Sequence, residues 1–229
     1  MGILYVVATP IGNLEDITIR AIKTLLSVPV IACEDTRHTG FLIKHIFDLY
    51  GASIANIQAP ISKKKYISVR DWNEAEAKEK VLVELEYNDV ALVSDAGTPL
   101  ISDPGFKLVR EARARGINVV PIPGASAVVT ALSASGLPTN KFTFLGFLPK
   151  KWEIRPEETT VIYESPTRTD KTLAKILERY PEAQIVIASE MTKIYERIID
   201  YETSKMRNGN EVIKGEVTIL VYLKDSGRS

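Results

Sequence analysis

The sequence has little of what builds covalent cross-links or metal centres. Its 229 residues include one cysteine and two histidines. A single thiol excludes an intramolecular disulfide framework and any site made of several thiolates, and it fits a reducing compartment. Two histidines with one cysteine are too few for an ordinary zinc site. We therefore expect a cytoplasmic protein that uses no metal.

Long apolar runs and an excess charge of one sign are also missing. The first apolar run, residues 3–8, is too short for a signal-peptide core or a membrane span, so neither secretion nor membrane insertion is expected. Basic and acidic residues number 29 each, which provides no global positive field for nucleic acid. RNA contacts would have to use local groups, each of which could equally be an ordinary exposed residue: Lys63–Lys65, Arg70, Lys150, Lys151 and Arg155, with Tyr66, Trp72 and Trp152 as stacking surfaces.

The chain has ordinary globular composition, and its pattern is that of an α/β protein. Apolar, β-branched segments alternate with helix-like segments in the first half, which is typical of a parallel sheet. The pattern predicts strands at 3–8, 30–33, 52–57, 90–93 and 119–121, and helices at 18–26, 39–47, 73–86 and 106–115. The charge run 63–65 is expected in a solvated loop, with a phosphate contact as the alternative.

A Pro-Ile-Pro-Gly segment at residues 121–124 interrupts this pattern where a sheet would be complete. Beyond it, strands follow one another with few helices between them, so a mixed sheet is expected there. We predict two domains, residues 1–122 with a mostly parallel, doubly wound sheet and residues 123–229 with a mixed sheet. The second half is expected to hold helices at 125–133 and 168–179 and strands at 142–147, 160–163, 184–188, 195–201 and 216–223.

Unusual loops follow the predicted strands, at the edge where a doubly wound sheet collects ligands. Residues 93–105, VSDAGTPLISDPG, combine two glycines and two prolines with little side-chain bulk, so the backbone would be exposed to a flat polar ligand. A purely structural turn seldom needs thirteen such residues. The charges at 34–37 could cap a helix or position a substrate, and the small residues at 124–127 could face a ligand or pack tightly against another helix. The usual dinucleotide, P-loop and nucleophile-elbow motifs are absent.

Eight segments carry a family resemblance from one end of the chain to the other. They are TPIGNLEDIT (9–18), CEDTRHT (33–39), VSDAGTPLISDPG (93–105), PIPGASA (121–127), LGFLP (145–149), YESP (163–166), ASEMTK (188–193) and KGEV (214–217). Together they resemble the ribosomal RNA small subunit methyltransferase I family of the tetrapyrrole methylase superfamily. The resemblance implies two α/β domains with S-adenosylmethionine in a cleft between them, a homodimer, and methyl transfer to the 2′-hydroxyl of a cytidine in the decoding region of 16S rRNA.

The same resemblance, carried over position by position, implies the cofactor contacts. They fall on Pro10, Ile11, Asp95, Gly97, Thr98, Ile101, Ser126, Ala127, Tyr163, Ala188 and Val217. One departure concerns the segment after YESP, where Thr167 stands in place of the family's histidine, just before Arg168. Any role of that histidine is absent from this chain.

A ribose hydroxyl is a poor nucleophile until it loses a proton, so a base or a charge stabiliser is expected close to it. We predict that Asp35 and Arg37 face the cleft from the first domain, and Glu190 and Lys193 from the second. Glu164 is a further acid/base candidate, and Arg37 or Arg168 could hold phosphate. Two alternatives stay open at this point: a methylase of the same fold that acts on a tetrapyrrole or a protein side chain, and a module that binds cofactor or RNA without turnover.

Overall fold

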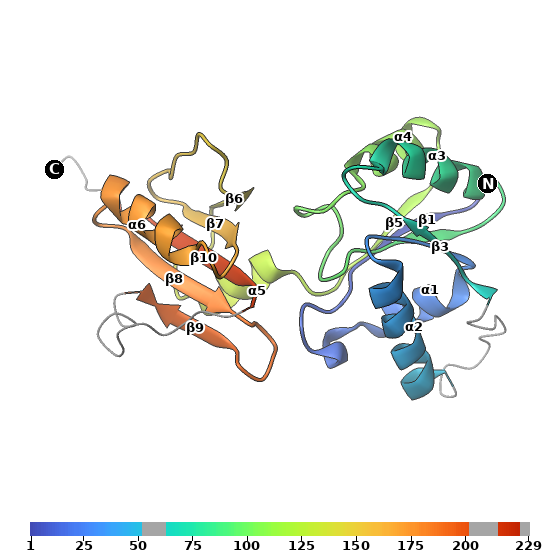
Figure 1. Cartoon of the computed structure of the whole chain (residues 1–229), viewed down its shortest axis with the longest axis horizontal. Helices are drawn as coiled ribbons and strands as arrows, with labels where there is room; N and C mark the ends of the chain where they lie inside the picture. Colours follow the sequence, from blue (N-terminus) through green and yellow to red (C-terminus); the bar gives the residue numbers. More distant parts are fainter. Residues whose placement is uncertain (52–62, 202–214, 225–229) are drawn as a thin grey trace. The chain divides into compact units, whose positions relative to one another are not determined.

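The computed structural model describes residues 1–51, 63–201 and 215–224. Within it the chain forms two compact units, Met1–Ser126 and Ala127–Ser229, which are described separately below (Figure 1). The strand predicted at 52–57 lies outside the described residues.

Unit 1 is built on a five-stranded parallel sheet. Its strands are β1 (Leu4–Val7), β2 (Val30–Cys33), β3 (Lys65–Ser68), β4 (Val90–Leu92) and β5 (Val119–Ile122), in the spatial order β3-β2-β4-β1-β5. β2 and β4 are buried along their whole length, because strands inside a parallel sheet have both faces covered. The predicted parallel sheet is confirmed.

Helices cover both faces of this sheet, as a doubly wound fold requires. α1 (Ile19–Ser27) and α2 (Thr36–Tyr50) share one apolar cluster with Ile31 and Cys33, whereas α3 (Glu74–Glu84) and α4 (Phe106–Ala114) share the other with Val30 and Ala32. This division follows from the two-residue period of side chains along β2. A short 3₁₀ helix, Leu14–Asp16, precedes α1, and the Thr18 hydroxyl accepts a hydrogen bond from Ala21 N to cap α1.

The basic run at residues 63–65 differs from the solvated loop expected there. Lys64 is buried, and its Nζ donates to the carbonyl oxygens of Leu26 and Val28, at 2.9 and 2.5 Å, where α1 ends. β3 begins at the next residue, and the Lys65 ammonium pairs with Glu84 Oε1 at 2.6 Å. Lys63 and Lys65 are exposed, but the solvated-loop prediction was wrong for Lys64, because an ammonium group can satisfy the open carbonyls at a helix end from within the fold.

Unit 2 contains a mixed five-stranded sheet with the spatial order β6-β7-β10-β8-β9. β6 (Phe142–Phe147) and β7 (Thr159–Glu164) are parallel, while β10 (Val217–Tyr222), β8 (Gln184–Ser189) and β9 (Arg197–Asp200) join by antiparallel pairing. This confirms the predicted mixed sheet.

Two helices flank the unit 2 sheet. α6 (Thr169–Arg179) packs Leu173 and Ile176 into an apolar cluster with Ile162, Ile187 and Ile219 from one face of the sheet. α5 (Ala127–Ala134) contacts β10. As in unit 1, a cluster of buried aliphatic side chains from alternate strand positions supplies the core.

Candidate active site

The carboxyl edge of the unit 1 sheet is a topological switch point. The segments after β1 and β2 lead to α1 and α2 on one face, whereas the segment after β4, which lies between those strands, leads to α4 on the other face. Connections that leave neighbouring strands in opposite directions open a crevice at the sheet edge, where open α/β sheets bind ligands. The predicted binding loops at 9–18, 33–39 and 93–105 all start from this edge.

Hydrogen bonds tie the loops after β1 and β4 together. Thr9 N donates to Gly97 O at 2.9 Å, and Gly97 N donates back to Thr9 O at 3.1 Å. The buried Ser94 hydroxyl donates to Gly97 O at 3.3 Å and helps to fix the same turn. The Thr98 hydroxyl donates to Ala125 O at 3.0 Å, which connects the β4 loop to the segment after β5. The predicted cofactor positions of unit 1 therefore belong to one hydrogen-bonded assembly of loops.

The backbone of the β4 loop is held in conformations that favour glycine. Gly97 has φ +80°, and a Cβ there would lie 3.1 Å from Ile11 Cγ2. Leu100 and Ser102 also have positive φ, at 75° and 70°, although neither is glycine. Non-glycine residues with this geometry cost stability and cluster at functional sites. Sequence composition indicated a shaped loop here, and the strain at these two positions is what the structure adds.

The far end of the β4 loop is fixed by a carboxylate from α3. Gly105 begins α4 with no side chain to cap it, and the buried Glu74 accepts instead from Gly105 N and Lys107 N at 3.2 and 3.4 Å. Lys107 Nζ lies 2.8 Å from Glu74 Oε2. The hydrogen bond from Lys107 is the main reason why the pKa of Glu74 lies below its ordinary value. The geometry of the loop thus depends on a residue that the sequence did not single out.

Carboxylates gather around the crevice. Burial raises the pKa of Asp103 to about 6. A hydrogen bond with Ser94 lowers this pKa, whereas the nearby charges of Glu34, Asp95 and Asp71 raise it further. Burial followed by the charge of Asp95 likewise raises the pKa of Glu34. Such mutual repulsion is relieved by a bound positive charge. The charge of Arg70 acts in the opposite direction on Glu34, so the carboxylates at this edge are only partly compensated by the protein itself.

Asp35 has mainly a capping role. Its Oδ1 accepts from Arg37 N at 2.8 Å and from His38 N at 3.4 Å, where α2 begins, and Oδ2 lies 3.3 Å from Arg37 Nη2 and 3.5 Å from Arg70 Nη2. The hydrogen bond from the Arg37 side chain, with those from the backbone, lowers the pKa of Asp35 to about 2. A carboxylate this weakly basic is a poor proton acceptor. The capping interpretation is therefore confirmed, while substrate positioning by these charges stays a prediction. Asp35 N also donates to Asp95 Oδ1 at 3.1 Å, which connects Asp35 to the β4 loop.

In unit 2, the predicted cofactor positions lie at one end of the sheet but not on one face. Tyr163, Thr218 and Ala188 are directly opposite one another on β7, β10 and β8, so their side chains share a face. Val217 is one residue earlier on β10, and its side chain is buried in the cluster beneath α6. A ligand on the first face would meet Val217 only through its backbone. Thr218, which the sequence did not single out, completes the row, and only the strand register reveals it.

Glu190 and Lys193 form a pair directly after β8. Lys193 Nζ donates to Glu190 Oε1 at 3.0 Å. Glu190 and Thr192 have positive φ, at 49° and 64°, so this turn also stores strain. A Cβ on Gly215 would overlap the Glu190 carboxylate, which shows how closely the backbone before β10 approaches it. The pair thus lies at the same end of the sheet as Tyr163 and Ala188.

The two tryptophans proposed as stacking surfaces differ in how accessible their rings are. Trp72 is 79% exposed. Trp152 lies against Tyr180, with ring centroids 6.2 Å apart, and the Arg179 guanidinium covers it at 5.3 Å. Trp152 therefore packs on the unit 2 core and is not an open stacking surface, contrary to the expectation.

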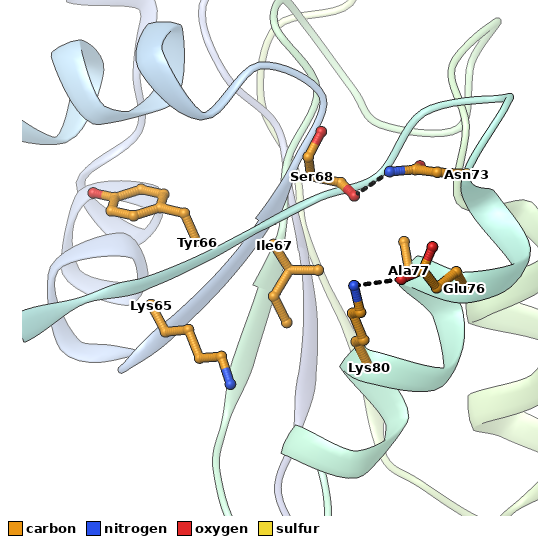
Figure 2. A pocket seen from close by; sticks show the side chains of 8 residues that line it. All are labelled: Lys65, Tyr66, Ile67, Ser68, Asn73, Glu76, Ala77 and Lys80. Atoms are coloured by element: carbon orange, nitrogen blue, oxygen red, sulfur yellow. Dashed lines mark hydrogen bonds and ion pairs between the residues drawn. The ribbon is translucent and has the colours of Figure 1, made fainter.

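A separate hollow of about 520 Å³ lies between the edge strand β3 and α3 (Figure 2). Asn73 Nδ2 donates to Ser68 O at 3.0 Å across its upper end, and Lys80 pairs with Glu76 at 2.6 Å. Its lysines thus have carboxylate partners. In the described part of the chain, no His, Cys, Asp and Glu side chains form a group suited to a metal ion, and no helix is long and apolar enough to cross a membrane.

The comparisons with known proteins agree with this fold. The model of the tetrapyrrole (corrin/porphyrin) methylases matches residues 3–206. The fold is similar to that of a diphthine synthase, with a TM-score of 0.69 and 12% identity over 96% of this chain and 90% of that one. It is also similar to uroporphyrin-III C-methyltransferase of Thermus thermophilus, solved in complex with S-adenosyl homocysteine, with a TM-score of 0.61 and 18% identity over 96% of this chain and 97% of that one.

Curated relatives are much more similar in sequence. The ribosomal RNA small subunit methyltransferase I of Pasteurella multocida is 44% identical over 96% of this chain and 79% of its own length. The protein of the same name from Hydrogenobaculum sp. is 44% identical over 97% of this chain and 96% of its own length. Identity at this level over nearly the whole chain confirms the resemblance seen in the loop segments. The chain therefore belongs to the ribosomal RNA small subunit methyltransferase I family, within the tetrapyrrole methylases.

Proposed function

We propose that this protein uses S-adenosylmethionine to methylate the ribose 2′-hydroxyl of a cytidine in the decoding region of 16S rRNA. The observation that carries the proposal is the match, over nearly the whole chain, to relatives named as small subunit rRNA methyltransferases. The eight loop segments of the sequence support the finer assignment to the cytidine 2′-hydroxyl. The substrate would be the cytoplasmic small ribosomal subunit, and family resemblance favours a homodimer.

Close backbone approach at the carboxyl edge of the unit 1 sheet supports the proposed cofactor site. Gly97 lies where a side chain would press on Ile11, and a Cβ on Gly124 would lie 3.0 Å from Ala8 Cβ, so the loops after β1, β4 and β5 approach as bare backbone. Such loops offer amide donors and carbonyl acceptors to a flat polar group such as adenine. The residues proposed to hold the cofactor in unit 1 are Pro10, Ile11, Asp95, Gly97, Thr98, Ile101 and Ser126.

The same crevice fits the cofactor in charge. When bound, S-adenosylmethionine supplies a methyl group on a positively charged sulfur. Burial, followed by the charges of neighbouring carboxylates, raises the pKa of Glu34 and of Asp103, and a bound cation would lower the cost of charging both groups. The family resemblance also implies cofactor contacts from unit 2, and we propose that Ala127, Tyr163, Ala188 and the backbone of Val217 make them.

The acceptor hydroxyl must lose its proton during the transfer. Among the predicted catalytic residues, Glu190 is the proposed proton acceptor, because Asp35 is held as a weakly basic cap by Arg37 and backbone amides. Lys193, 3.0 Å from Glu190 Oε1, holds the carboxylate in position and can stabilise negative charge on the acceptor oxygen. The Arg37 side chain is 90% exposed, so we propose that it exchanges its contact with Asp35 for one with a phosphate.

Isosteric variants separate these roles. Glu190→Gln and Lys193→Met should lower the rate of methyl transfer to small ribosomal subunits by about 100-fold, the usual size of a general acid–base contribution, with S-adenosyl homocysteine affinity unchanged. Asp35→Asn should instead act through the start of α2 and lower stability. Full activity in both unit 2 variants would remove the proposed base.

The same assay distinguishes the alternatives. A methylase of this fold directed at a tetrapyrrole or a protein side chain would transfer label without ribosomal subunits. A module without turnover would bind S-adenosyl homocysteine in a calorimeter and yield no labelled product.

A further inference from the structure

The end of β6 carries an exposed aromatic side chain that a β-bulge turns toward Tyr163. Along a regular strand, residues three apart point to opposite faces. The register of β6 against β7 shifts between Phe144 and Gly146, so Phe144 pairs with Val161 and Phe147 pairs with Tyr163. Both phenylalanine rings then pack edge-on against Tyr163, at centroid distances of 4.8 and 6.3 Å. Phe147 nevertheless stays 54% exposed.

An arginine lies over this exposed ring. The Cζ atom of Arg168 is 5.7 Å from the centroid of Phe147, within the range of a cation–π contact. Arg168 stands just before α6, and its side chain is 59% exposed. The two residues therefore present a planar cation and an aromatic ring side by side at the surface of unit 2.

A buried carboxylate fixes the orientation of this arginine. Glu164, whose side chain is 4% exposed, accepts a hydrogen bond from Arg168 Nε at 2.8 Å through Oε1, and Arg168 Nη2 forms an ion pair with the same oxygen at 2.7 Å. Its Oε2 accepts from the Thr172 hydroxyl at 2.7 Å, and Ser165 N donates to Oε1 at 2.8 Å. Among the described residues no acceptor is paired with Nη1 of Arg168, and the side chain is 59% exposed, so N–H groups remain accessible to a ligand.

The chemistry of this pair selects the kind of ligand. Glu164 neutralises the charge of Arg168, so the site does not attract anions at long range but offers N–H donors in one fixed direction. Guanidinium N–H groups match phosphate oxygens, and guanidinium planes and exposed aromatic rings are the surfaces on which unstacked RNA bases stack. An unstacked nucleotide supplies both a phosphate for the guanidinium and a base for the aromatic ring.

Its place on the sheet relates this site to the proposed chemistry. The ends of β7 and β8 that carry Glu164 and Glu190 are both paired with the start of β10. Two strand spacings, about 10 Å, separate those ends, so nucleotides close together in one RNA strand can meet both.

We propose that Phe147 and Arg168 form a contact for one unstacked nucleotide of the RNA, next to the nucleotide that is methylated, with Glu164 as the positioning residue. The inference rests on the proposed function, whose acceptor it would help to place. Thr167, where the family resemblance expects a histidine, lies beside this contact, with its hydroxyl 3.3 Å from that of Ser165.

The test measures binding of the full chain to small ribosomal subunits that lack the methyl group, with S-adenosyl homocysteine present. Arg168→Lys keeps the positive charge but loses the planar guanidinium with its N–H donors, and Phe147→Leu keeps apolar bulk but loses the aromatic ring. Each should weaken binding about 10-fold, and Phe147→Tyr should restore it, since base stacking survives the added hydroxyl. The affinity for S-adenosyl homocysteine should stay within about twofold in all three.

The chain offers matched controls. Arg179 also covers an aromatic ring, at the other end of α6, and Phe142 is 46% exposed at the other end of β6. Arg179→Lys and Phe142→Leu should bind small subunits like the unsubstituted protein.

The outcomes separate this inference from the proposed function. Unchanged RNA binding in Arg168→Lys and Phe147→Leu overturns the nucleotide contact, even if methyl transfer by the unsubstituted protein is normal. Equal losses in the control variants also overturn it, because the effect would then be general. Absence of methyl transfer by the unsubstituted protein overturns the proposed function, while the binding series still decides on the contact.

Discussion

Asp103→Asn should change the stability of the protein in a way that depends on pH. Substitution of this half-buried carboxyl by asparagine removes a charge that the folded protein holds at a cost. Burial, with the charges of Glu34, Asp95 and Asp71, raises the pKa of Asp103 from 3.8 to about 6. Two pKa units correspond to about 3 kcal/mol, and screening at a partly exposed group reduces this to about 1–2 kcal/mol.

The sign follows from proton binding in the two states. Because the pKa is higher in the folded than in the unfolded protein, the folded state binds more protons between about pH 4 and pH 6, and stability falls over that range as pH rises. The asparagine side chain of the variant stays neutral throughout. The stabilisation by Asp103→Asn should therefore be small at about pH 4, near half its full size at about pH 5, and complete above about pH 7.

The assay is chemical unfolding of both proteins at acidic and neutral pH. Asp71→Asn is the control, since it removes a charge from the same group of carboxylates at an exposed position. A pH-independent difference for Asp103→Asn, or an equal gain in the control, would refute the account of a buried charge. If the carboxylate is retained for the sulfonium cation, the same substitution should weaken S-adenosylmethionine binding several-fold and leave binding of S-adenosyl homocysteine, whose sulfur is neutral, unchanged.

Three further predictions concern the loops and the buried thiol. Gly97→Ala should lower the free energy of unfolding by about 1–2 kcal/mol and abolish high-affinity binding of the methyl donor, because alanine at φ +80° is strained and its Cβ meets Ile11. The control is Gly40→Ala, at a helical site with open space around it. Calorimetry should show unchanged donor binding for this control, and unfolding should show a gain in stability of about 0.5–1 kcal/mol. Glu74→Gln should cost about 1 kcal/mol and speed amide exchange at Gly105, and equal protection in both proteins would show that the cap is dispensable. Cys33, buried and with its pKa raised to about 11, should react with a thiol reagent only after unfolding, and rapid labelling of the native protein would contradict the structure.

Most of the fold could be predicted from the sequence, because its strands are short apolar runs and its helices carry one apolar stripe. The segment at residues 30–33 became β2 with the predicted bounds, and 142–147 became β6. β3 was missed because its residues, Lys65–Ser68, begin with charge, and the burial of Lys64 depends on carbonyls 36 and 38 residues away. Local patterns contain no such information.

The part of the candidate site that lies in one loop was easier to predict from the sequence than the part formed by neighbouring strands. The composition of residues 93–105 indicated the β4 loop, yet the reciprocal bonds between Thr9 and Gly97 depend on the adjacency of β1 and β4. Thr218 was missed, and Val217 faces the core, because only pairing in register shows which neighbours on β10 share a face with Tyr163. The pairing of Arg168 with Phe147 likewise depends on a bulge that no periodicity reveals.

The central claim is that this chain moves a methyl group from S-adenosylmethionine to a ribose hydroxyl of the small subunit rRNA. Small ribosomal subunits lacking the mark are incubated with methyl-tritiated donor, and the rRNA is then hydrolysed in alkali. A methylated 2′-oxygen cannot attack the neighbouring phosphate, so the account predicts label in a single alkali-resistant dinucleotide that begins with cytidine. Label in mononucleotides, in ribosomal protein or in no product at all would contradict it.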